Sequence, residues 1–211
     1  MSLKGIANAI SDRNRFRKIH YFMDYFKANE YTKILDVGAE GKEYQRHSNI
    51  LKKLYPYPQN ITVLGIDHYR DFLTRYPSVR AVCYDGRGFP FGNDEFDICW
   101  CNAVLEHVGN RERQIEFLRE IRRVSKAAFV STPTKFLPIE PHTRIPVLHY
   151  LPKSIFDKLL ILFGKPWAAA DYMHLLSLRD IVRLLEESNI SDYLIKKNHL
   201  LGFTVDFVIL F

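Results

Sequence analysis

The chain of 211 residues contains no apolar run long enough to cross a bilayer. A membrane-spanning helix needs about 20 consecutive apolar residues, whereas the longest apolar stretches here have the length of a strand or a short helix. Residues 1–18 also lack the apolar core and the small-residue cleavage site of a secretory signal. We therefore expect a cytoplasmic protein without a transmembrane segment.

Cysteine is scarce, and the three cysteines have neither metal-binding nor redox spacing. Cys99 and Cys101 lie two residues apart in an apolar run, which places them on one face of a strand. This pattern predicts small core residues in a reducing compartment. No compact grouping of His, Asp and Glu calls for a metal ion, so we expect none.

Two common phosphate-binding sequences are missing. The chain has no Gly-Lys-Ser/Thr sequence of a P-loop, and GAEGKE at residues 38–43 does not supply the G-x-G-x-x-G of dinucleotide-binding folds. The first absence excludes ATP or GTP hydrolysis of the P-loop type.

The formal charge of +6 comes largely from residues 4–33 and 111–126. A basic surface can bind nucleic acid or an anionic membrane. However, no arginine-rich run with interleaved aromatic residues is present, so a solvated basic face is the favoured interpretation. Nucleic acid stays a less favoured partner, and the sequence leaves both a monomer and a homodimer open.

Apolar runs of strand length alternate with amphipathic segments along the chain. The predicted strands are 32–37, 61–67, 79–84, 96–102, 127–131, 193–197 and 203–211, and the predicted helices are 12–29, 42–54, 70–75, 111–124, 153–163 and 177–188. A hairpin through 198–202 joins the last two strands. The pattern predicts an α/β fold, with a Rossmann-like, doubly wound, mostly parallel sheet of about seven strands. We expect an antiparallel C-terminal strand and helices on both faces.

We expect one domain over residues 1–211. It would comprise an N-terminal helix at about 12–29, a cofactor-binding half at about 32–132, and an acceptor or lid segment at about 133–176 before the last helix and strands. Residues 133–152 contain five prolines and little periodicity, which favours an ordered functional loop.

Glycine, acidic and amide residues recur where the predicted strands end. Gly38 and Gly41 follow the first strand, Asp67 and Asp85 the second and third, and Asn102 ends the fourth. Ligands of doubly wound sheets bind beyond the carboxyl ends of the strands. Any one of these residues could simply make a turn or cap a loop, but the ordered set indicates a nucleotide-like ligand.

Five segments in this order resemble the class I S-adenosylmethionine-dependent methyltransferases. They are ILDVGAEG, LGID, VCYDGRGFPFGNDEFDICWCNAVLEHV, FLREIRRV and AAFVSTP, and the resemblance covers about residues 32–135. It is strongest to the small-molecule branch called methyltransferase type 11. It implies S-adenosyl-L-methionine as cofactor, S-adenosyl-L-homocysteine as product, and methyl transfer by in-line displacement.

The resemblance also implies roles for single residues. Asp36 and Gly38 would lie at the amino-acid end of the cofactor, Gly41 would let it pack on the backbone, Asp67 would hold the ribose hydroxyls, Asp85 and Gly86 would contact the adenine, and Asn102 with Ala103 would flank the methionine portion. His107 belongs to a segment that is commonly structural in this branch, and we also consider it a substrate-binding candidate.

Glu40 is the main departure, because the family usually has glycine at this position. Its side chain could point to solvent, pair with the ammonium group of the cofactor, or repel the cofactor's carboxylate. The last case leads to an alternative function, a non-catalytic binding module with weakened cofactor affinity.

The acceptor site is expected in the irregular segment 132–144. There Glu140 or His142 would act as a general base and Arg144 would anchor an anionic acceptor, although hydrogen bonds that merely fix the loop are a competing interpretation. His149 is a further substrate-binding candidate. The segment PIEPHT is similar to methyltransferases of bacterial cell-surface glycan pathways, so a sugar or glycan precursor is one candidate for the small-molecule acceptor.

An RNA methyltransferase is the remaining alternative, given the basic balance. Neither an Asn-Pro-Pro-Tyr-type signature of amino methylation nor a cysteine-nucleophile motif is present. This mildly favours O- or C-directed chemistry on a small molecule.

Overall fold

The computed structural model describes residues 3–43, 48–136, 151, 153–166, 173–200 and 202–211. Its helices are α1 (Leu3–Phe26), α2 (Ile50–Leu54), α3 (Arg70–Arg75), α4 (Arg111–Val124), α5 (Lys153–Leu162) and α6 (Leu178–Glu187), with short 3-10 helices η1 (Pro58–Asn60) and η2 (Leu105–His107). The strands are β1 (Ile34–Val37), β2 (Ile61–Gly65), β3 (Arg80–Cys83), β4 (Phe96–Asn102), β5 (Ser125–Pro133), β6 (Leu194–Leu200) and β7 (Phe203–Leu210).

Among the described residues, seven strands form one sheet in the order β3-β2-β1-β4-β5-β7-β6. Strands β1 to β5 pair in parallel, whereas β7 is antiparallel to both β5 and β6. The predicted fold class and the C-terminal hairpin are therefore confirmed. The strand order reverses between β1 and β4, which is the point where doubly wound sheets bind their ligands.

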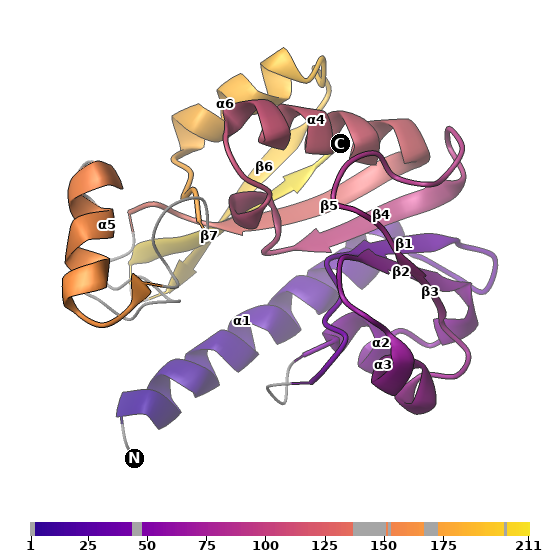
Figure 1. Cartoon of the computed structure of the whole chain (residues 1–211). Coiled ribbons are helices and arrows are strands. Elements are labelled where there is room, and N and C mark those ends of the chain that lie inside the picture. The colour runs from indigo at the N-terminus through magenta and orange to yellow at the C-terminus, as the bar shows by residue number, and fades with distance from the viewer. Residues whose placement is uncertain (1–2, 44–47, 137–150, 152, 167–172, 201) are drawn as a thin grey trace.

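Helices cover both faces of this sheet (Figure 1). On one face, α4 and α6 bury Phe117, Leu118, Ile121, Ile181, Leu184 and Leu185. On the other, α1, α2 and α3 bury Ile19, Phe22, Ile50, Leu51 and Phe72. The central strands β1 and β2 are buried at every position, which explains why they read as continuous apolar runs.

Cys99 and Cys101 lie wholly buried in the core on the α4 and α6 side of the sheet. Burial raises the pKa of both thiols well above the ordinary value, so they stay protonated and act as small apolar residues. The expected core role is confirmed.

Two helices differ from the predicted ranges. Helix α1 begins at Leu3 rather than near residue 12, and it ends at Phe26 because Lys27 adopts a left-handed backbone with φ of 47°. Helix α2 begins only at Ile50, so the predicted start near Lys42 is wrong. Asn49, with φ of 56°, has a left-handed conformation immediately before it.

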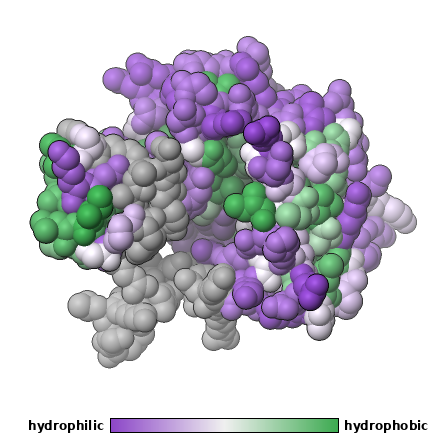
Figure 2. All heavy atoms as spheres, viewed as in Figure 1, coloured by the Kyte–Doolittle hydropathy of each residue, from purple (hydrophilic) through white to green (hydrophobic). Residues whose placement is uncertain are grey.

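Helix α5 lies at one end of the molecule, beyond the sheet (Figure 1). Its exposed apolar side chains include Ile155, Ile161 and Leu162, and Phe163 immediately after the helix is also exposed. Figure 2 shows hydrophobic (green) surface at this end of the molecule.

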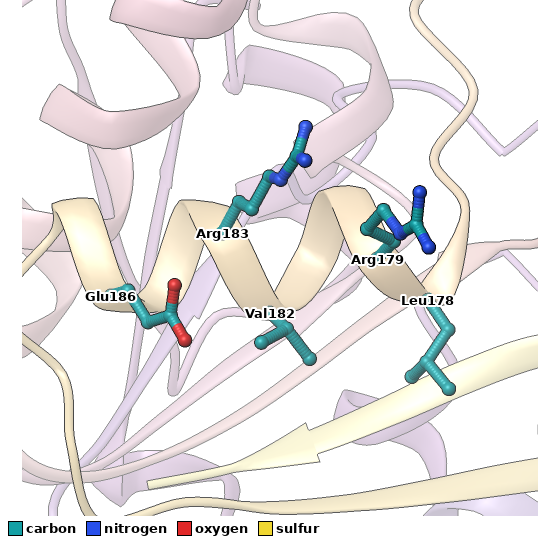
Figure 3. A pocket seen from close by; sticks show the side chains of 5 residues that line it. All are labelled: Leu178, Arg179, Val182, Arg183 and Glu186. Carbon is teal, nitrogen blue, oxygen red and sulfur yellow. The ribbon is translucent and has the colours of Figure 1, made fainter.

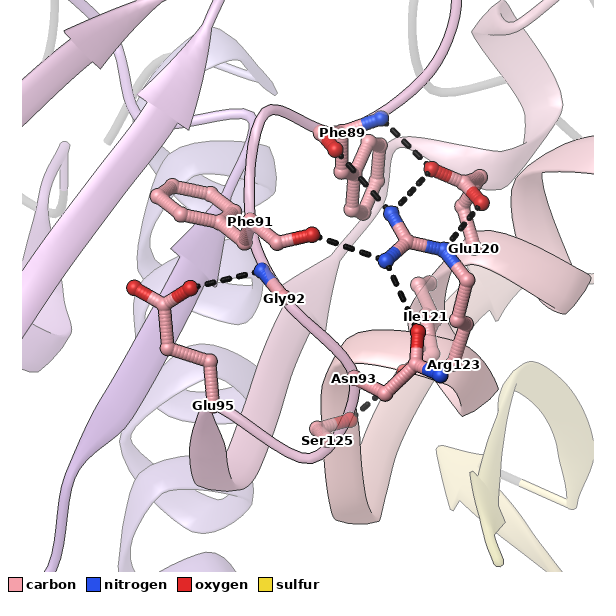
Figure 4. A network of polar contacts seen from close by, with 9 residues as sticks. All are labelled: Phe89, Phe91, Gly92, Asn93, Glu95, Glu120, Ile121, Arg123 and Ser125. Atoms are coloured by element: carbon pink, nitrogen blue, oxygen red, sulfur yellow. Dashed lines mark hydrogen bonds and ion pairs between the residues drawn. The ribbon is translucent and has the colours of Figure 1, made fainter.

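The loop after β3 is anchored to α4 by Arg123 (Figure 4). The guanidinium donates to the backbone carbonyls of Phe91 at 2.7 Å and Phe89 at 3.0 Å. It also binds the carboxylate of Glu120, which in turn accepts from the Phe89 amide at 2.6 Å. Because this loop begins just after Asp85, Arg123 fixes one side of the predicted ligand edge.

Replacing Arg123 with Met is expected to lower the free energy of unfolding by about 2 kcal/mol, because charged hydrogen bonds to two carbonyls and a carboxylate are lost. Urea denaturation followed by circular dichroism measures this change. Arg122→Met is the matched control, since Arg122 is exposed and donates a single bond of 3.3 Å to the Ser125 carbonyl. Equal losses for the two variants would contradict the anchor.

The pH dependence provides a further check on the same pair. The hydrogen bond from Arg123 lowers the pKa of Glu120. A carboxyl whose pKa is lowered by folding stabilises the protein above its ordinary pKa, and this contribution is lost as the pH falls through the folded value. The gap between wild type and Arg123→Met should therefore narrow in acid.

Candidate functional site

Four of the predicted cofactor-binding residues lie at neighbouring strand ends. Gly38 directly follows β1, Asp67 and Asp85 lie two residues beyond β2 and β3, and Asn102 is the last residue of β4. Since β3, β2, β1 and β4 are adjacent in the sheet, these residues share one edge, as the sequence predicts. Their roles in binding stay predictions.

Gly38 occupies a position where any side chain would be strained. Its φ is 81°, and a Cβ atom there would lie 2.3 Å from Cγ2 of Val104. Its amide donates to the carbonyl of Leu64 at 2.8 Å, which ties the turn to β2. The backbone therefore turns sharply at the end of β1 without a side chain over the edge.

Gly41 brings the glycine loop into contact with the predicted ribose-binding acid. The Gly41 amide donates to Oδ2 of Asp67 at 3.2 Å, and a Cβ at Gly41 would lie 2.7 Å from the carbonyl oxygen of His68. Asp67 is exposed to solvent. One carboxylate thus binds the loop and still faces the edge, where it can accept further hydrogen bonds.

Glu40, the residue that departs from the family, is bonded within its own loop region. Its Oε2 accepts from the hydroxyl of Ser48 at 2.6 Å, and its carbonyl accepts from the amide side chain of Asn49 at 2.9 Å. Tyr69 donates its hydroxyl to the carbonyl of neighbouring Ala39 at 3.0 Å. Burial raises the pKa of Tyr69, which keeps that donor protonated.

Asp36 is almost wholly buried and forms an ion pair with Lys52 of α2, which is also buried. Lys52 also contacts Oδ1 of Asn49 at 3.4 Å. Burial raises the pKa of Asp36, and the charge of Lys52 opposes this rise. The acid predicted at the amino-acid end of the cofactor therefore has an internal cation as its partner.

At the predicted adenine end, Asp85 and Gly86 are exposed. Oδ1 of Asp85 accepts from the amide of Arg87 at 3.0 Å, which shapes the turn, and Gly86 has φ of 81°. Within the neighbouring segment, Tyr84 is partly buried and burial raises its pKa to about 12.

Asn102 is joined to helix α1 through a chain of side-chain hydrogen bonds. Its Oδ1 accepts from the hydroxyl of Ser131 at 2.8 Å, and Ser131 accepts from the buried ammonium of Lys18 at 3.2 Å. Lys18 also pairs with Asp206 of β7 at 3.3 Å. The amide of Asn102 is thereby oriented by residues from α1, β5 and β7.

His107 lies in η2 and is half-buried, with Nε2 3.9 Å from a carboxylate oxygen of Glu106. Glu106 is fully buried, and it accepts from the hydroxyl of Thr132 at 3.0 Å. Its carbonyl accepts from the amide of His174 at 2.7 Å. Glu106 thus ties η2 to the end of β5, which the sequence reasoning did not foresee.

Four predicted residues lie outside the described part of the chain: Glu140, His142, Arg144 and His149. Their assignments as base and substrate-binding residues stay predictions. Within the described ranges, no group of three or more His, Cys, Asp and Glu could hold a metal ion.

A small cavity of ≈ 40 Å³ lies at the ends of β1 and β4. Its lining residues are Arg15, Asp36, Val37, Gly38, Ala39, Glu40, Asn49, Ile50, Leu51, Lys52, Trp100 and Asn102. The sequence reasoning missed Arg15, Lys52 and Trp100. Nothing in the local pattern marks Arg15, because its place in the cavity depends on how α1 packs across the sheet.

A larger open hollow of ≈ 680 Å³ lies along the outer surface of α6 (Figure 3). All five lining residues belong to that helix: Leu178, Arg179, Val182, Arg183 and Glu186. None of the strand-end residues lines it, so the hollow is separate from the candidate site.

No helix in the described ranges combines the length and the apolar character required to cross a membrane. This agrees with the absence of a long apolar run in the sequence.

Comparison with known proteins gives a family match in the N-terminal part of the sheet and the elements that follow it, up to β5. Residues 35–128 match the family model described as a methyltransferase domain. A search of curated proteins finds no match to the chain. The family match confirms the resemblance inferred from the sequence segments.

Solved structures share the fold at low sequence identity. One is the structure of a SAM-dependent methyltransferase from Methanosarcina mazei. Its TM-score is 0.58 at 15% identity, and the match covers 89% of this chain and 95% of that chain. Another is geranyl diphosphate C-methyltransferase from Streptomyces coelicolor A3(2), in complex with Mg²⁺, geranyl diphosphate and S-adenosyl-L-homocysteine, with TM-score 0.59, 12% identity, and coverage of 94% and 79%. A third is the N-terminal domain of EvdMO1 in the presence of SAH and D-fucose, with TM-score 0.55, 17% identity, and coverage of 93% and 81%.

Proposed function

We propose that this chain, which has the fold of the class I S-adenosylmethionine-dependent methyltransferases and matches a methyltransferase family model over residues 35–128, transfers a methyl group from S-adenosylmethionine to a small-molecule acceptor. The observation that carries the proposal is the contact between Gly41 and Asp67 at the carboxyl edge. It places an exposed carboxylate beside the bare backbone of Gly41, an arrangement that suits a nucleoside.

The chemistry of the residues at this edge supports the proposal. At Gly38 a Cβ would collide with Val104, and the bare backbone there admits a ligand. The exposed carboxylate of Asp67 can accept hydrogen bonds from the two ribose hydroxyls. Asp85 and Gly86 follow the next strand along, β3, where we place the adenine, and Asn102 ends β4 on the other side of β1.

When bound, the sulfonium of S-adenosylmethionine supplies an activated methyl group. The chain's own task is to hold the acceptor nucleophile in line with that methyl group, and such alignment alone accelerates reactions greatly. Asn102 borders the methionine portion, and its amide orientation is set by Ser131. A base is needed only where the acceptor must lose a proton, and we assign that role to His142 or Glu140.

The acceptor is proposed to approach from the ends of β4 and β5. His107 and Thr132 lie on that side, and the segment 133–152 leaves β5 there. Arg144 and His149 would complete the acceptor site. Sugar and isoprenoid diphosphate ligands accompany two structures of the same fold, which supports a small molecule, with a sugar or glycan precursor as the first class to test.

Calorimetric titration with S-adenosylhomocysteine tests the proposal. Wild type should bind, and Asp67→Ala should weaken binding by about 100-fold or more, because two charge-assisted hydrogen bonds to the ribose are lost. Asp71→Ala is the matched control, since Asp71 is also an exposed acid of this segment and lies in the first turn of α3.

If S-adenosylhomocysteine at millimolar concentration gives no heat of binding and no thermal shift, the proposal is overturned and a non-catalytic module is favoured. A salt-sensitive shift with RNA fragments, together with methyl incorporation into RNA, would instead point to an RNA methyltransferase. With cofactor binding established, mass shifts of one CH₂ group across a panel of sugars and other metabolites identify the acceptor.

A further inference from the structure

The ≈ 40 Å³ cavity lies at one end of the candidate site. Its walls come from α1, the end of β1, the glycine loop, α2 and β4, whereas Asp67 and Asp85 follow β2 and β3 on the other side of β1. A nucleoside held by those two acids therefore has its sulfur substituent directed toward this cavity. The cavity is where the amino-acid portion of the cofactor belongs.

Four charged side chains line the cavity, two of each sign: Arg15, Lys52, Asp36 and Glu40. Lys52 and Asp36 form a buried ion pair with each other, so their charges largely cancel. Arg15 and Glu40 come from different segments, α1 and the glycine loop. They add one positive and one negative charge to the lining from two separate segments.

Glu40 keeps hydrogen-bonding capacity beyond its contact with Ser48. Among the described residues, its Oε2 accepts from one hydroxyl at 2.6 Å, whereas a carboxylate accepts about four hydrogen bonds. The bond from Asn49 to the Glu40 carbonyl fixes the backbone. The half-buried carboxylate is thus held at the wall of the cavity.

Arg15 is held in place by the residues on either side of it along α1. Asn14 donates to the carboxylate of Asp206, and Lys18 binds both Asp206 and Ser131. These contacts fix the helix against β5 and β7. The starting point of the Arg15 side chain is therefore pre-organised before any ligand binds.

We propose that Arg15 binds the carboxylate and Glu40 the ammonium group at the amino-acid end of the cofactor. This inference rests on the proposed function. A guanidinium matches a carboxylate in a two-bond geometry, and a carboxylate pairs with an ammonium. The assignment explains how a glutamate stands where the family usually has glycine: Asp36 is engaged by Lys52, and Glu40 takes the contact with the ammonium group.

Paired titrations with two nucleosides test this assignment on the full chain. S-adenosylhomocysteine carries the amino acid, whereas 5′-methylthioadenosine has the same adenosine and sulfur but ends in a methyl group. Arg15→Met should weaken S-adenosylhomocysteine binding by about 10- to 100-fold and leave 5′-methylthioadenosine binding unchanged. Glu40→Gln should act in the same direction.

Arg17→Met serves as the matched control, because Arg17 lies on the same helix, is exposed, and donates to the carbonyl of His199 at 3.4 Å. It should leave both affinities unchanged. Arg15→Lys keeps the charge but loses the two-bond geometry, so it should give an intermediate affinity for S-adenosylhomocysteine. It also serves as the second variant should Arg15→Met fold poorly.

The outcomes separate this inference from the proposed function. The amino-acid assignment is overturned if Arg15→Met and Arg15→Lys bind S-adenosylhomocysteine as tightly as wild type does. It is also overturned if they lose affinity for both nucleosides equally. In either case the cofactor proposal stands. Should wild type bind neither nucleoside, both fail together.

Discussion

Replacing Lys52 with Met is expected to lower the free energy of unfolding by about 3–5 kcal/mol, because it leaves the carboxylate of Asp36 buried without its cation. Both side chains are almost wholly buried beneath the glycine loop. Without Lys52, the pKa of Asp36, already raised by burial, should rise further. Urea denaturation at several pH values measures the effect.

The pH dependence has a definite sign. An acid whose pKa is raised by folding contributes stability at low pH that is lost as the pH rises through the folded value. The deficit of Lys52→Met should therefore be smallest in acid, where Asp36 is protonated, and should grow toward neutral pH.

Lys53→Met is the matched control, since it removes the neighbouring lysine of the same helix. Lys53 pairs with Glu43 at 3.0 Å, and its side chain is about one-third exposed (31%), so its loss should cost less than about 1 kcal/mol. The double variant Asp36→Asn/Lys52→Met should recover part of the stability. A loss for Lys52→Met no larger than that of Lys53→Met would contradict the buried pair.

Replacing Gly38 with Ala is expected to cost about 2–5 kcal/mol of folding free energy and to abolish measurable cofactor binding. The left-handed backbone disfavours any side chain by about 1–2 kcal/mol, and the collision with Val104 at 2.3 Å adds about 1–3 kcal/mol of overpacking. Relief of that collision displaces the turn on which the cofactor packs. Thermal melts and S-adenosylhomocysteine titration measure the two effects.

Gly86→Ala separates the backbone strain from the collision. Gly86 has the same φ of 81°, but a Cβ there meets only Ile66, at 3.9 Å. Its stability loss should therefore be limited to the backbone cost. Adding Val104→Ala to Gly38→Ala should restore part of the stability. If Gly38→Ala and Gly86→Ala lower the free energy of unfolding equally, the contact between residue 38 and Val104 does not add to the backbone cost.

The central strands β1, β2, β4 and β5 could be predicted from the sequence because they are largely buried and therefore form short apolar runs. The helix α4 was predicted with its observed bounds, since Asn110 caps it and its apolar stripe is regular. The late start of α2 was not predictable in this way, because the left-handed turn at Asn49 depends on contacts of the loop with Glu40.

The nucleoside side of the site could be read from the sequence because Gly38, Asp67 and Asp85 each follow a recognisable strand. The amino-acid side could not. Lys52 and Arg15 reach the cavity only through the packing of α2 and α1 on the sheet, and Lys18 bonds Asp206 from the opposite end of the chain. Charge pairs between such distant segments leave no local pattern.

A crystal structure of the chain grown with S-adenosylhomocysteine tests the central claim most directly. We predict the ligand across the carboxyl ends of β3, β2, β1 and β4, with ribose hydroxyls on Asp67, adenine beside Asp85 and the amino acid in the cavity between Arg15 and Glu40. A nucleoside bound elsewhere, or an edge filled by the chain's own side chains while Asp67 faces away, would contradict the account.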